Sequence, residues 1–241
     1  MRIKILRVMA YGLGAYGLFA FGSFFIRPAC GCRRDGRVIS CASNMKQIGT
    51  AFAQYVQDSD DCLPPYTSAD GRRTWREAVY PFVKSTSVYH CPDDAADYSH
   101  ATQEHLPHSY AANYIHASGR NRGLFAAPNE PPMALTKLAS PSTVIALVDV
   151  RGYDGPEWNI TSSAFLPASG RRIYDHAASH HNWFQAPAKI GSNVLLADGH
   201  VKRMKPLDTL APINLWTRDN SAFTGQELAN AEAILKHAQE E

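Results

Sequence analysis

The feature that most constrains this chain is an uncharged apolar run near its start, from Val8 to Ile26, which follows three basic residues. A helix of about 18 or more such residues is long enough to cross the hydrocarbon core of a bilayer. A cleaved signal peptide begins in the same way, but its apolar part is usually shorter and ends in a small-x-small site. We find no convincing site of that kind here and expect a retained transmembrane anchor over residues 1–26. A cleaved signal peptide and a buried core helix are the alternatives.

The run contains "GLGAYG", from Gly12 to Gly17, which matches the dinucleotide-binding pattern G-x-G-x-x-G. That loop must lie between a strand and a helix, with an acidic residue about 20 positions further on. Here the glycines lie inside the apolar run, and the first acidic residue after them is Asp35. Glycine is common in membrane helices, where it allows close helix contact. The membrane interpretation is therefore favoured over a nucleotide site.

After the run, proline and glycine in residues 27–40 predict a linker, because both residue types interrupt helices. Apolar residues then recur every three or four positions from Cys41 to Val56, which predicts an amphipathic helix. Pro64 and Pro65 end that pattern, because proline cannot continue a helix. We expect a globular domain over residues 41–241.

Further along the chain, "RTWREAVYPFVKS" predicts a second short helix, and "HSYAANYIHASGRNRGLF" a short strand. The β-branched and aliphatic segment Ser140–Val150 predicts a buried strand. Residues 192–204, "SNVLLADGHVKRM", predict a hairpin around Asp198-Gly199, with a type I′ turn. A capping box at Thr224 predicts a terminal helix. The expected fold class is therefore α+β, with the amphipathic helix packed on an antiparallel sheet and long loops between elements.

The net charge is +2, and the basic residues are spread along the chain. Nucleic-acid binding requires clustered basic residues, so no nucleic-acid partner is expected. The chain has five cysteines, and Cys30-Gly-Cys32 is too tight for ordinary zinc-finger spacing. Basic residues flank both ends of the apolar run, so the positive-inside rule does not decide the orientation.

Four residues are candidate metal ligands: Asp149, Asp198, His200 and His181. We considered that they converge at one end of the sheet and hold calcium or another divalent metal, since carboxylate and imidazole are common metal ligands. The alternative is structural, because Asp198 is favoured in a hairpin turn without any ligand. No bound cofactor is expected otherwise. The sequence lacks H-E-x-x-H and G-x-S-x-G, the motifs of common hydrolases.

Four segments together resemble a known family. They are "CASNMKQIGTAFAQYVQDSDDCLPPY", "TWREAVYPFVKS…VYHCPDD", "SYAANY" and "GSNVLLADGHVK". With the strand "STVIALVDV", their order resembles the pseudopilin-like, prepilin-type proteins with a His-x9-Asp-Gly motif, which are related to the type II secretion major pseudopilin. The resemblance implies a pilin-like fold, with an N-terminal helix anchored in the membrane. It also implies a disulfide between Cys41 and Cys91, the family's two common cysteine positions.

Two departures from the family are visible. The prepilin leader and its glutamate are absent, since no glutamate occurs before Glu77. The histidine of the His-x9-Asp-Gly motif, with nine residues between it and Asp198, would fall at Ala188, and the nearest candidates are His180 and His181.

The expected function is that of a non-enzymatic structural or assembly subunit, linked to type II secretion or type IV pilus-like machinery. Its expected place is the inner membrane, as a single-pass protein with the globular domain in the periplasm. The expected partners are the membrane, further copies of the chain or secretion-system subunits. Two alternatives remain open: a monomeric anchored periplasmic binding module, and a metal-dependent enzyme using the His/Asp cluster.

Overall fold

The computed structural model describes residues 29–68, 73–94, 98–113, 123–126, 130–149, 159–160, 192–205 and 207–222, with Gly225, Ala229 and Ala233. The chain divides into two units, Met1–Arg37 and Val38–Glu241. The second unit carries the sheet and the core described below. The anchor predicted over residues 1–26 lies outside the described residues. In the part that is described, no helix is both long enough and apolar enough to cross a membrane.

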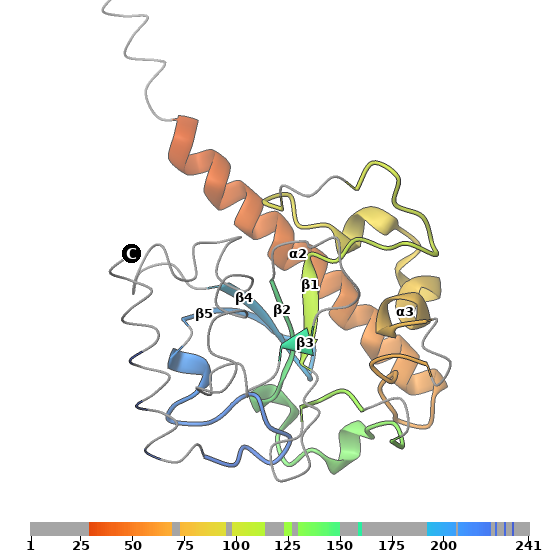
Figure 1. The fold of residues 1–241 in the computed structure, drawn as a ribbon, viewed down its shortest axis with the longest axis vertical. Helices are drawn as coiled ribbons and strands as arrows, with labels where there is room; N and C mark the ends of the chain where they lie inside the picture. Colours follow the sequence, from red (N-terminus) through yellow and green to blue (C-terminus); the bar gives the residue numbers. More distant parts are fainter. Residues whose placement is uncertain are drawn as a thin grey trace, which may run out of the picture. The chain divides into compact units, whose positions relative to one another are not determined.

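Helix α2 runs from Ala29 to Asp58 and is the longest described element (Figure 1). The prediction of a linker over residues 27–40 is therefore wrong from Ala29 onward. Glycine costs about 1 kcal/mol in a helix interior, which is a weak penalty when only Gly31 and Gly36 incur it between Ala29 and Ser40. Helix formation is also cooperative, so a helix held by packing further along propagates through weak positions.

One face of α2 is buried, as its apolar spacing predicts. Positions three or four apart lie on the same side of a helix, so a repeat of this kind makes one continuous stripe. The buried stripe within the second unit comprises Val38, Cys41, Met45, Ile48, Phe52 and Val56. All but Val38 belong to the main core cluster, which also contains residues of α3 and of the strands.

The sheet has the strand order β3-β1-β2-β4-β5. Strands β1 (Tyr110–Asn113), β2 (Ile145–Asp149), β4 (Ser192–Leu196) and β5 (Val201–Met204) pair antiparallel. The short β3 (Asn159–Ile160) pairs parallel with β1. The helices α2 and α3 pack on this sheet, and the predicted α+β class with an antiparallel sheet is confirmed (Figure 1).

Helix α3, Trp75–Val83, confirms the predicted second helix. Thr74 caps its start in a reciprocal capping box with Glu77, which satisfies backbone donors that a helix start leaves open. The side chain of Arg76 is buried and donates from Nη2 to the Tyr110 carbonyl of β1 at 2.7 Å. The helix is therefore held to the sheet by a charged hydrogen bond as well as by apolar packing.

The segment 207–222 follows the hairpin and is hydrogen-bonded to β1 and β2. The backbone N–H of Ile145 donates to the Leu215 carbonyl at 2.7 Å. The side-chain amide of Asn113 donates to the carbonyls of both Ile145 and Trp216, at 2.8 and 3.0 Å. Trp216 is fully buried. This segment is therefore fixed to the sheet rather than a loose connection.

Beyond that segment, Gly225, Ala229 and Ala233 are helical, but the rest of the predicted terminal helix lies outside the described residues.

Candidate functional site

The predicted hairpin is present, but its turn differs from the predicted type. The Gly199 N–H donates to the Leu196 carbonyl at 2.9 Å, and the Leu196 N–H donates to the His200 carbonyl at 2.8 Å. Gly199 has φ of +83°, whereas Asp198 is not among the residues with positive φ. A type I′ turn requires positive φ at both central residues. The loop is instead a three-residue turn, with Gly199 as the left-handed residue that closes it.

The side chain of Asp198 organises this turn from within. One carboxylate oxygen accepts from the His200 backbone N–H at 3.0 Å, and the other lies 2.8 Å from Nδ1 of His200. Partial burial acts to raise the pKa of Asp198. The hydrogen bonds from His200 and the charges of His200 and Lys202 outweigh this effect, so the pKa is lowered overall. The aspartate therefore remains ionised and holds the turn closed.

The turn lies directly against helix α2. Nζ of Lys46 donates to the Gly199 carbonyl at 2.8 Å. One helical turn further along α2, a methyl group on Gly49 would lie 2.9 Å from Cδ1 of Leu195 and 3.3 Å from Cα of Gly199. Since 2.9 Å is closer than real carbon contacts, any larger residue at this position would force the Leu195 side chain or the helix to shift. Asp198-Gly199 is thus a packing element as well as a turn.

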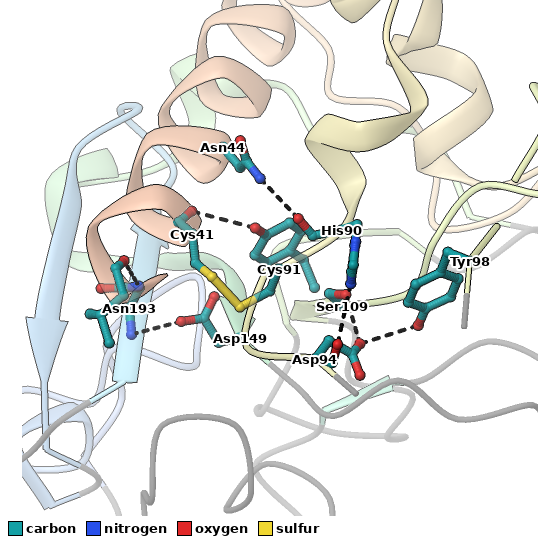
Figure 2. Close-up of a disulfide and its surroundings, with 11 residues drawn as sticks. Cys41, Asn44, His90, Cys91, Asp94, Tyr98, Ser109, Asp149 and Asn193 are labelled. Carbon is teal, nitrogen blue, oxygen red and sulfur yellow. Dashed lines mark hydrogen bonds between the residues drawn. A yellow bond between two sulfur atoms is a disulfide. The ribbon is translucent and has the colours of Figure 1, made fainter. Parts of the chain in front are cut away.

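The disulfide between Cys41 and Cys91 is present, as the resemblance implied (Figure 2). Both cysteines are fully buried, and their Cα atoms are 5.0 Å apart. The bond joins α2 to the segment that follows the 3₁₀ helix Thr86–Tyr89. Beside it, the side-chain amide of Asn44 donates to the His90 carbonyl at 2.9 Å. A covalent bond and a hydrogen bond therefore fix the same segment to the helix.

Asp94, three residues after Cys91, anchors a small buried polar cluster (Figure 2). Its carboxylate accepts from Oγ of Ser109 at 2.7 Å and from the hydroxyl of Tyr98 at 3.2 Å. Burial raises the pKa of Tyr98 to about 12, and the adjacent Asp94 carboxylate adds to the shift. Tyr98 therefore remains a neutral donor at ordinary pH, and the cluster ties the segment to the entry of β1.

Asp149 lies at the end of β2, next to the disulfide (Figure 2). The Asn193 backbone N–H donates to its carboxylate at 3.2 Å. The side-chain amide of Asn193 in turn donates to the Val38 carbonyl of α2 at 3.0 Å. Asp149 and Asn193 are both buried, so they form a polar connection between the sheet and the helix.

Of the four candidate metal ligands, the structure describes Asp149, Asp198 and His200, and it keeps Asp149 apart from the other two. Asp149 lies beside Asn193 at the start of β4, whereas Asp198 and His200 follow its other end. Asn193 and Asp198 are five positions apart, and the strand from Asn193 to Leu196 alone covers about 10 Å. His181 lies outside the described residues. Among the residues that are described, no three His, Cys, Asp or Glu side chains form a metal-binding group.

Several residues that hold these contacts carry weak sequence signals. Asn193 and Asp149 are polar residues at the ends of otherwise apolar strand segments, a pattern that indicates a buried hydrogen bond rather than a solvent-facing position. Gly49 interrupts an amphipathic helix, which indicates a close approach by another backbone. Nothing in the sequence alone identifies the partner in any of these contacts.

Comparison of the chain with protein-family models, with curated proteins and with solved structures gave no significant match.

Proposed function

We propose that this chain is a non-enzymatic, membrane-anchored, pseudopilin-like structural or assembly subunit. The expected anchor is the apolar run Val8–Ile26, and the expected working part is the helix-on-sheet domain. Type II secretion or type IV pilus-like machinery is the expected setting.

The observation that carries the proposal is that the segments of the family resemblance meet on one helix. Helix α2 is joined to the "HCPDD" segment by the disulfide and to the Asp-Gly hairpin by the close contact at Gly49. Residues of the two most recognisable motifs, the HCPDD segment and the Asp-Gly hairpin, therefore hold α2 in its place on the domain. This arrangement supports a role in which α2 is a rigid scaffold for assembly.

The disulfide also supports a location outside the cytoplasm. Disulfides persist mainly in oxidising compartments such as the bacterial periplasm. With the globular domain in the periplasm, the anchor would be a single-pass helix in the inner membrane.

Self-association in the membrane tests the proposal. A photo-crosslinking amino acid at Ile39, a residue of α2 whose side chain is 68% exposed, should give a ladder of dimers and larger species in native membranes. The same probe at the exposed Thr136 is the matched control and should give a weaker ladder, because this residue lies in a short 3₁₀ helix that is bonded to Asp61, beyond the opposite end of α2 from Ile39. Monomer alone from both positions would contradict the proposal.

A monomeric anchored binding module is the second candidate, and the absence of glutamate before Glu77 favours it. Inside a membrane, a buried glutamate requires a partner, and its loss removes one pairing on which fibre assembly would depend. The crosslinking experiment separates the two candidates, because only the first one predicts a ladder.

A further inference from the structure

Two cysteines, Cys30 and Cys32, lie in helix α2 rather than in the linker that the sequence predicted for this segment. Each residue of a helix is rotated by about 100° from the one before it, so these two lie about 200° apart around the helix axis. A disulfide requires the two Cβ atoms to be about 3.5–4.5 Å apart. Residues on opposite sides of one helix do not meet this condition. Cys30 and Cys32 therefore cannot pair with each other while the helix is intact.

The cysteine count then leaves a thiol over. The chain has five cysteines, and Cys41 is bonded to Cys91. Cys62 is a free thiol in the structure, and it can take at most one partner in any case. Since Cys30 and Cys32 do not pair with each other, at least one of them has no cysteine of its own chain to bond. An odd cysteine in an exported protein indicates pairing between chains.

The path of the chain places Cys30 and Cys32 in the same compartment as the disulfide. Residues 33–40, between Cys32 and Cys41, are rich in arginine and cannot cross a membrane. Disulfides persist mainly in oxidising compartments, so the bond at Cys41 supports an oxidising environment for the two thiols as well.

We propose that Cys30 and Cys32 form disulfides with the same two residues in neighbouring copies of this chain, which joins the starts of their α2 helices covalently. This inference rests on the proposed function, because it requires copies that associate. Each new bond joins two thiols, and the two electrons and two protons that they lose reduce one disulfide of a protein oxidant to a dithiol. An oxidant of this class is also required to form the Cys41–Cys91 bond.

The position of the two cysteines favours a second copy over a different protein as the partner. Both follow closely on Ile26, the last residue of the apolar run. Copies that are anchored by the same run carry Cys30 and Cys32 at the same depth, so parallel neighbours bring the same residues side by side. Because the two residues lie on opposite sides of the helix, one copy can be bonded to two neighbours. The products are therefore expected to be longer than dimers.

The test uses the full chain in its native membranes. Free thiols are blocked with N-ethylmaleimide before lysis, and the sample is run on a denaturing gel with and without reductant. The wild-type chain should give dimers and larger species that collapse to monomer with reductant. Mass spectrometry of each band should find this chain alone.

Serine variants assign the bonds. Cys30→Ser or Cys32→Ser alone should stop the ladder at the dimer, because one cysteine can join a helix to only one neighbour. The double variant should give monomer alone, whereas the matched control Cys62→Ser should retain the whole ladder. A ladder that survives the double variant, that passes the dimer in either single variant, or that is lost with Cys62→Ser would overturn the inference. A second protein in the bands would also overturn it.

The photo-crosslinking probe at Ile39, placed in the double serine variant, separates this inference from the proposed function. We expect the light-induced ladder to remain, because association does not require the covalent bonds. Wild-type monomer without reductant, together with a light-induced ladder, would overturn the inference alone. Monomer in both experiments would overturn the proposed function, and the inference with it.

Discussion

The contact between helix α2 and the hairpin turn can be tested by replacing Gly49 with alanine. The added methyl group would lie 2.9 Å from Cδ1 of Leu195, a fully buried side chain, and 3.3 Å from Cα of Gly199. Overpacking of this kind costs about 1–3 kcal/mol, because neither a buried leucine nor a backbone atom can move away freely. Alanine regains about 1 kcal/mol of helix propensity. The net expectation is a loss of up to about 2 kcal/mol in the free energy of unfolding.

The same helix provides a matched control. A methyl group on Gly36 would meet no atom within 4 Å, and this residue is exposed. Gly36→Ala should therefore leave the free energy of unfolding unchanged or raise it by up to about 1 kcal/mol. Urea unfolding of the full chain in mild detergent, followed by near-UV circular dichroism, measures both variants. If Gly49→Ala were as stable as Gly36→Ala, the reasoning about the helix–hairpin contact would be refuted.

Three further predictions concern the same domain. Replacing Cys41 and Cys91 with alanine should lower the free energy of unfolding by about 4 kcal/mol, the chain-entropy figure for a loop of this length, and reductant should no longer affect the urea midpoint. Gly199→Ala should cost about 1–2 kcal/mol in the same assay because of the left-handed backbone, whereas Gly199→Asn should cost less; equal losses would argue against strain. Burial, and secondarily the charge of Arg76, lower the pKa of His108 to about 4. In the unfolded chain this histidine gains a proton near its ordinary pKa of 6.5, but in the folded chain only near 4. Stability should therefore fall by about 1–3 kcal/mol between pH 6.5 and 4, after allowance for partial exposure. His108→Leu should remove this acid-dependent loss, and a loss that persists would assign it to other groups.

Local patterns predicted much of the fold. The three-to-four spacing from Cys41 to Val56 gave the buried face of α2, because side chains at that spacing share one side of a helix. The aliphatic segment after Pro141 gave β2, and the Asp-Gly pair gave the hairpin. These features depend on residues close together in sequence, so a sequence pattern carries them.

Other features depend on contacts between distant residues. The turn is a three-residue loop rather than type I′, because the Leu196 and His200 hydrogen bonds set its length. The helix begins at Ala29 despite two glycines, because helix propagation outweighs their local cost. The segment around Trp216 has no regular period, and only its bonds to β1 and β2 reveal that it belongs to the core.

The separation of Asp149 from Asp198 has a similar reason. Asp149 and Asp198 each come after an apolar strand segment. From the sequence, both could therefore lie at the same end of the sheet. Because β2 and β4 pair antiparallel, the C-terminal ends of the two strands lie at opposite ends of the sheet. Strand direction comes from the topology of the whole sheet, which the pattern of a single strand does not contain.

The most direct test of the central claim is N-terminal sequencing of the mature protein extracted from membranes after a high-salt and alkaline wash. A retained anchor predicts that the protein stays in the washed membranes and begins at Met1 or Arg2. A protein that is released by the wash and begins near Cys30 would contradict the claim, because the apolar run would then be a cleaved signal peptide.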